Sequence, residues 1–193
     1  MDKVKLGLIG IIIILLLVIV EIVASPIPPL VQNQMATTTT TTTIRTGETS
    51  WEVAFSPKGG ATNHIINWLD KSNSSVCAAI YSFTNNDISG AFIRAKQRDV
   101  NITISMDKEQ LNIQGSEYQT LKNANISVRV DRRSGLLYDK YMVIDGKVVV
   151  TGSYNWTVNA EDTNRENLII LQDPALASLY LKNCQDIWQA STP

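Results

Sequence analysis

The sequence predicts an α/β domain over residues 51–193, with a mixed β-sheet flanked by helices and preceded by one N-terminal transmembrane helix. Three observations support this fold class. Between residues 51 and 130, short apolar runs alternate with segments of helical periodicity, which is typical of a parallel sheet covered by helices. Two later apolar runs flank an Asp-Gly pair, which predicts an antiparallel hairpin. A long apolar stretch before residue 25 predicts the membrane helix.

The first half of the domain is predicted to alternate strands and helices. In its first helix, Ile65, Ile66 and Leu69 recur at the spacing of one helical face. The predicted strands are Glu52–Ser56, Ser75–Phe83, Val100–Met106 and Ile126–Val130. The predicted helices are Ala61–Lys71, Asp87–Arg98 and Ser116–Asn123. Such an order is the pattern of a largely parallel sheet.

The second half of the domain changes character. Tyr141–Ile144 and Lys147–Thr151 are apolar runs on either side of Asp145-Gly146, which is the strongest short hairpin signal. Glu166–Leu171 is a further predicted strand. Ala175–Gln189 is a closing helix, since Asp173-Pro174 supplies a cap and a first-turn proline in the usual order. The hairpin makes the sheet mixed rather than parallel.

Residues 1–25 are predicted to be a membrane segment. The apolar stretch from Leu6 to Ala24 has 19 residues, of which Glu21 is the one charged residue, and about 20 are needed to cross a bilayer as a helix. Lys3 and Lys5 place the short N-terminal side in the cytoplasm. We expect an uncleaved anchor through residues 6–24, giving a single-pass membrane protein with its C-terminal domain extracytoplasmic. The alternative is a signal peptide cleaved near Ala24, which would give a secreted domain.

Residues 26–50 are predicted to be a linker. Three prolines come first, and an unbroken threonine run from Thr37 to Thr43 follows. This composition has no hydrophobic face to bury, so we expect a stalk between membrane and domain.

The overall composition excludes several classes of protein. Charged residues make up 18% and the formal net charge is −1, which excludes a strongly basic nucleic-acid binder and a highly charged disordered tail. Two cysteines exclude a disulfide-rich scaffold and a four-thiolate metal site. A single histidine, His64, excludes any mechanism that needs two histidines from one chain.

The candidate site lies between residues 136 and 171. Tyr138 and Lys140 share a strand face, and so do Ser153 and Asn155 if that segment is extended. Gly152 permits a close backbone approach. Further polar groups come from Glu166 and from arginines at 132, 133 and 165. Cations and amide donors that converge suit a phosphate oxyanion. No Asp or His cluster has metal-ligand spacing, so we predict no metal and no cofactor.

These residues carry a resemblance to a known family. Tyr138-Asp139-Lys140, Asp145 and Gly152-Ser153-Tyr154-Asn155 resemble the phospholipase D superfamily signature H-x-K-x4-D-x6-G-S-x-N, and every spacing matches. Flanking stretches, which are similar to the small bacterial nuclease branch, are Phe55-Ser56-Pro57, Tyr81-Ser82-Phe83-Thr84, Ala95-Lys96-Gln97-Arg98 and Arg165-Glu166-Asn167. The resemblance covers essentially all of residues 51–193, and the most similar subgroup is the single-motif endonuclease-like proteins.

The resemblance implies a mechanism and a set of residue roles. In the family, one histidine attacks phosphorus, a second histidine from a second motif protonates the leaving oxygen, and no metal is needed. One motif per chain then implies a homodimer that shares one site around a two-fold axis. Carried over, Lys140 and Asn155 bind phosphate with help from Ser153, and Glu166 orients the nucleophile. Asp145, in the turn, and Gly152 are structural. The implied ligand is a phosphodiester in nucleic acid or phospholipid.

Tyr138 is the one departure from the signature, because it stands at the position of the nucleophilic histidine. A phenol with a pKa near 10 is a poor proton shuttle at neutral pH. Three interpretations stay open: a non-catalytic relative that binds phosphodiesters, an altered mechanism that uses Tyr138, and a variant of an active enzyme. In function, the alternatives are a membrane-tethered phosphodiesterase, a phosphodiester-binding module at the membrane surface, and a surface-displayed dimer with a relic pocket.

Two smaller features also leave alternatives open. Cys77 lies in an apolar strand and Cys184 in the last helix, and either a disulfide or two buried thiols fits that placement. N-glycosylation sequons begin at Asn73, Asn101, Asn125 and Asn155. A sugar on Asn155 would block the proposed site.

Overall fold

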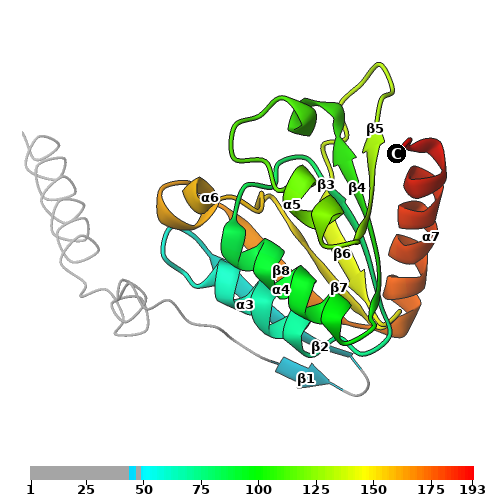
Figure 1. The fold of residues 1–193 in the computed structure, drawn as a ribbon. Coiled ribbons are helices and arrows are strands. Elements are labelled where there is room, and N and C mark those ends of the chain that lie inside the picture. Colours follow the sequence, from blue (N-terminus) through cyan, green and yellow to red (C-terminus); the bar gives the residue numbers. More distant parts are fainter. Residues whose placement is uncertain (1–43, 47–48) are drawn as a thin grey trace, which may run out of the picture. The chain divides into compact units, whose positions relative to one another are not determined.

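The computed structural model describes residues 44–46 and 49–193 (Figure 1). The predicted membrane segment and most of the predicted linker lie outside these residues. Within the described ranges, every helix is too short or too polar to cross a bilayer.

The described residues form one eight-stranded mixed sheet in the order β1-β2-β8-β7-β6-β3-β4-β5. β3, β4 and β5 are parallel neighbours, and every other adjacent pair is antiparallel. The predicted α/β class with a mixed sheet is therefore confirmed. The strands are β1 (Ile44–Thr46), β2 (Thr49–Phe55), β3 (Ser75–Ile80), β4 (Asn101–Asp107), β5 (Ser127–Asp131), β6 (Lys140–Ile144), β7 (Val148–Gly152) and β8 (Asn167–Gln172).

The helices flank this sheet on both faces. α3 and α4 lie side by side with α5 on one face, over a core that includes Ile65, Phe92 and Ile104. α7 covers the other face, where Cys184 forms a disulfide with Cys77 of β3 (Figure 1). The helices are α3 (Ala61–Asp70), α4 (Asn86–Gln97), the 3₁₀ helix η1 (Lys108–Leu111), α5 (Tyr118–Asn123), α6 (Val158–Asp162) and α7 (Pro174–Ala190).

Local sequence signals account for several element boundaries. The Asp173 side chain accepts hydrogen bonds from the Ala175 and Leu176 amides, so it caps α7 as the sequence predicts. At the β6–β7 turn, Asp145 and Gly146 have φ angles of 53° and 62°, the positive values that a type I′ hairpin turn requires.

Two features of the topology differ from the prediction. The first long strand, β2, does not join the parallel group. It pairs with β8 instead, with Phe55 opposite Asn167. Sequence order alone predicts neighbours along the chain, whereas this pairing joins segments more than a hundred residues apart. The sheet also begins earlier than expected, because β1 and the start of β2 fall within the range predicted as linker.

Candidate active site

The strand register brings the motif residues to one end of the sheet. Lys140 begins β6, Gly152 ends β7, and Glu166 directly precedes β8. Tyr141 pairs with Thr151 and Gly152 pairs with Leu168, so these three strand ends lie side by side. Ser153, next to Gly152, and Tyr138, just before β6, belong to the same end.

Asp145 lies at the opposite end of β6, away from the other motif residues. Its carboxylate accepts hydrogen bonds from the backbone amides of Asn73, Ser74 and Ser75 and from the Ser74 hydroxyl. Burial alone would raise the pKa of Asp145, but these hydrogen bonds hold that pKa below its usual value. The side chain thus joins the hairpin turn to the start of β3, and it does not reach the site.

Gly152 permits a backbone approach that no side chain would allow. Its φ is 154°, and a Cβ added there would lie 2.1 Å from the carbonyl oxygen of Asn167. The close approach sets Ser153 against the start of β8, where the Asn167 amide donates to Ser153 Oγ at 3.1 Å. Any residue other than glycine at this position of the signature would therefore clash with the backbone of β8.

Ser153 and Glu166 form the centre of a polar cluster. Ser153 Oγ donates to Glu166 Oε2 at 2.5 Å, and Asn164 Nδ2 donates to Glu166 Oε1 at 3.0 Å. The Glu166 backbone amide donates to Ser56 Oγ, which fixes this residue to the end of β2. Both carboxylate oxygens of Glu166 are thus engaged, and its side chain is held in one position.

Lys140 is nearly buried, with 8% of its surface exposed. Its ammonium donates to the carbonyl oxygen of Tyr138 at 2.7 Å, which uses one of its three N–H donors. Burial lowers the pKa of Lys140, while the negative charges of Glu166 and Asp139 oppose that shift.

Tyr138 is 63% exposed, and its ring lies over the Lys140 ammonium, which is 3.5 Å from the ring centroid. The Tyr81 ring lies against it, with centroids 4.8 Å apart and planes inclined by 48°. Tyr81 is anchored in turn, because its hydroxyl donates to Glu109 at 2.7 Å, and this bond raises the pKa of Tyr81 to about 12. A phenol therefore occupies the place where the family signature has an imidazole.

Asn155 is half-buried, and its Oδ1 atom is buried without a hydrogen-bond partner among the described residues. An unpaired buried oxygen is costly and therefore rare, so this atom is set apart from the other buried polar groups of the site. The other three sequon asparagines, at 73, 101 and 125, are exposed.

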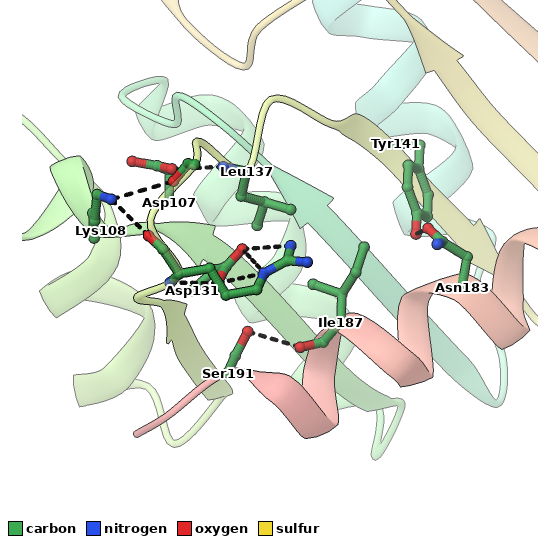
Figure 2. Close-up of polar contacts among 10 residues, drawn as sticks. Asp107, Lys108, Asp131, Leu137, Tyr141, Asn183, Ile187 and Ser191 are labelled. Atoms are coloured by element: carbon green, nitrogen blue, oxygen red, sulfur yellow. Dashed lines mark hydrogen bonds and ion pairs between the residues drawn. The ribbon is translucent and has the colours of Figure 1, made fainter.

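The segment between β5 and β6, which carries Tyr138, is held by hydrogen bonds to Asp107 and Lys108 (Figure 2). Asp107 is fully buried at the end of β4, and its Oδ2 accepts from the Leu137 amide at 2.7 Å. Its other oxygen accepts from the Glu109 amide at 2.9 Å. The Lys108 ammonium donates to the carbonyls of Arg133 and Gly135. The sequence alone does not predict these hydrogen bonds of Asp107 and Lys108. The one sequence feature that points to them is a carboxylate, Asp107, at the end of a strand of alternating pattern.

Replacing Asp107 by alanine is expected to destabilise the protein by about 2–4 kcal/mol, because two backbone amides lose their acceptor and that of Leu137 is buried. Urea unfolding of the full chain measures the loss. Asp107→Asn is the matched control, since it keeps the shape and one acceptor oxygen and should lose less. Equal stability of Asp107→Ala and wild type would contradict this role.

Of the other charged residues considered in the sequence analysis, three are paired within the domain and one, Arg165, is exposed. Arg133 pairs with Asp131 at 2.7 Å, and this guanidinium lowers the pKa of Asp131. Arg132 donates to Thr192, whereas Arg165 is exposed beside Glu166 in a shallow cavity that Phe55 also lines. His64 is hydrogen-bonded to Glu52 of β2 at 3.0 Å. In the described ranges, no three His, Cys, Asp or Glu side chains are grouped as in a metal site.

Comparisons with known proteins agree with this geometry. The family model described as "Cardiolipin synthase, PLD-like domain" matches residues 65–188. A phospholipase D of Rickettsia conorii is 37% identical over 129 residues, which are 67% of this chain and 64% of that protein. A mitochondrial cardiolipin hydrolase of Xenopus laevis is 33% identical over 59% of this chain and 54% of its own length. The chain thus spans less than two thirds of these relatives.

Solved structures give the same result. Nuc from Salmonella typhimurium, a phospholipase D family member, has a TM-score of 0.71 and 32% identity, covering 75% of this chain and 97% of Nuc. NucT from Helicobacter pylori has a TM-score of 0.65 and 24% identity over 74% of this chain and 98% of its own. With the sheet, the motif spacing and the matched domain in agreement, the chain belongs to the phospholipase D superfamily.

Proposed function

We propose that this chain binds a phosphodiester at the motif end of the sheet, and that Tyr138 leaves it without the hydrolytic step of its family. One observation carries the proposal: Lys140, Ser153 and Asn155 keep the positions of the signature, while the nucleophile position alone is changed. Glu166, which lies outside the signature, is hydrogen-bonded to Ser153. Lys140 and Asn155 would donate to the phosphate oxygens, with Ser153 beside them. The relatives named as phospholipase D, cardiolipin hydrolase and Nuc support a phosphodiester as the ligand.

The family mechanism uses two motifs, so we propose that two copies of this chain share one site. Exposed apolar side chains around the motif support a homodimer. Phe55, Leu136 and Val158 are 61%, 50% and 52% exposed. Leu136 is close in sequence to Tyr138, and Val158 is close to Asn155. Phe55 pairs with Asn167, the residue after Glu166. Covering such side chains with a second copy would stabilise association by burying apolar surface. A strict monomer at micromolar concentration would contradict the shared site.

A hydrolytic enzyme that uses Tyr138 itself is the second candidate, and the exposure of that side chain beside an ammonium favours it. The phenol oxygen would attack phosphorus, one ester P–O bond would break, and the leaving oxygen would take up the phenol's proton. Water would then displace the tyrosine oxygen from the phosphotyrosine and release the phosphomonoester. The two candidates differ in turnover rather than in binding.

We further propose that the domain lies outside the cytoplasm, anchored through residues 6–24, or secreted after cleavage near Ala24. The Cys77–Cys184 disulfide supports this placement, because cytosolic reductants keep most protein thiols reduced. The phosphodiester would then be an extracytoplasmic nucleic acid or a phospholipid headgroup of the outer surface.

Replacing Lys140 by alanine is expected to weaken binding of a phosphodiester at least about tenfold, since a hydrogen bond to a charged group contributes roughly 1.5–3 kcal/mol. Titration of the full chain with a fluorescent oligonucleotide, and separately with anionic vesicles, measures this loss at two salt concentrations. Lys182→Ala on the exposed side of α7 is the matched control. Unchanged binding by Lys140→Ala would sink the proposal.

A further inference from the structure

Tyr138 forms an exposed aromatic surface next to the proposed phosphate site. The ring is 63% exposed, so part of its surface is open to a ligand. It is also not loose, because Lys140 lies 3.5 Å from its centroid and Tyr81 lies against it. A fixed, exposed aromatic ring beside an anion site is the arrangement that proteins use to stack a planar group.

The ring is held in place through two routes that meet at one carboxylate. In the first, Asp107 Oδ2 accepts from the amide of Leu137, the residue before Tyr138. In the second, Asp107 Oδ1 accepts from the Glu109 amide, and the Glu109 side chain accepts from the Tyr81 hydroxyl. Because Asp107 is fully buried, both routes start from a rigid point. A ligand that stacks on Tyr138 therefore finds the ring already ordered, which lowers the entropic cost of binding.

We propose that the exposed face of Tyr138 is a stacking subsite for an unpaired nucleobase whose neighbouring phosphate is held by Lys140. This inference rests on the proposed function, and it selects single-stranded nucleic acid among the phosphodiesters.

The positive charge of Lys140 next to the Tyr138 ring decides between two ligands, a neutral nucleobase and a cationic headgroup. A quaternary ammonium headgroup would also be attracted to an aromatic face. In this chain, however, the Lys140 ammonium already lies on Tyr138 and is 5.4 Å from the Tyr81 centroid, so a second cation would meet a like charge. A neutral nucleobase carries no such penalty, and an ammonium behind the ring draws electron density from the face that would stack. The arrangement thus favours a base over a choline headgroup.

The test compares two short single strands of equal length and charge, an oligodeoxyadenylate and an abasic strand. The full chain is expected to bind the base-bearing strand about tenfold more tightly than the abasic strand. Tyr138→Leu should bring the ratio of the two affinities to about one, whereas Tyr138→Phe, which keeps the ring, should preserve it. Tyr118→Leu is the matched control, since that tyrosine also has a lysine, Lys122, over its ring but lies on α5.

The outcomes separate the subsite from the function on which it rests. Equal binding of both strands by the wild type would overturn the stacking subsite and leave phosphodiester binding intact. If the wild type binds neither strand, the proposed function is overturned as well. Competition by phosphatidylcholine vesicles that Tyr138→Leu abolishes would identify a cation site and would also overturn the inference.

Discussion

Replacing Tyr138 by histidine is expected to give the protein a metal-independent phosphodiesterase activity at least about a thousandfold above that of the wild type. The reason is that the other residues of the proposed site have the arrangement that the family signature implies. Lys140 is held beneath residue 138, and Ser153 bridges to an ordered Glu166. An imidazole with a pKa near 6.5 attacks and shuttles protons at neutral pH, whereas a phenol with a pKa near 10 does neither well. Two substituted copies would supply both histidines of a shared site.

The assay uses wild type, Tyr138→His and Tyr138→Phe with plasmid DNA, RNA and a chromogenic phosphodiester, with a chelator present. Tyr118→His is the matched control, because it adds an imidazole away from the motif. Hydrolysis by the wild type that Tyr138→Phe abolishes would show that the phenol is a working nucleophile, against our proposal. Failure of every variant on every substrate would mean that more than residue 138 has been lost from the site.

The motif was predictable because its spacing encodes the strand register. Four residues between Lys140 and Asp145 complete β6, and six between Asp145 and Gly152 complete the turn and most of β7. A hairpin of this length returns the chain to the end where it began, so Gly152 reaches the level of Lys140 and Ser153 follows directly after it. The alternation rule likewise puts Tyr138 and Lys140 on one face, and the ring does cover the ammonium.

The support beneath the motif was not predictable, because it depends on contacts between distant segments. Leu137 is bound by Asp107, and Glu166 is fixed through Ser56 at the end of β2, which neighbours β8 rather than β3. Single-sequence patterns report which residues face a core, and they do not report which strands become neighbours. The same limit applies to the two cysteines, whose sequence positions fit a bond and two thiols equally well, whereas packing of α7 on β3 joins them.

Removing the Cys77–Cys184 disulfide is expected to cost about 2–5 kcal/mol of stability. The two cysteines are 107 residues apart, so the bond closes most of the domain into one loop and restricts the unfolded chain strongly. It also fixes α7 to its face of the sheet, where Tyr180 and Leu181 of the helix pack against buried apolar side chains. Urea unfolding of Cys77→Ala/Cys184→Ala against the wild type measures the loss.

A reductant provides the matched comparison, because it should destabilise the wild type and leave the double alanine variant unchanged. A wild type that is equally stable with and without reductant would contradict a structural role for the bond. The result also bears on where the domain works. If folding depends on this bond, α7 is held less firmly in a reducing cytosol, and the hydrogen bond from the Tyr141 hydroxyl to Asn183 of α7 is weakened (Figure 2). Because Tyr141 follows Lys140 directly, we expect a loosened α7 to disturb the proposed phosphate site, so that reduction of the disulfide weakens phosphodiester binding as well as stability.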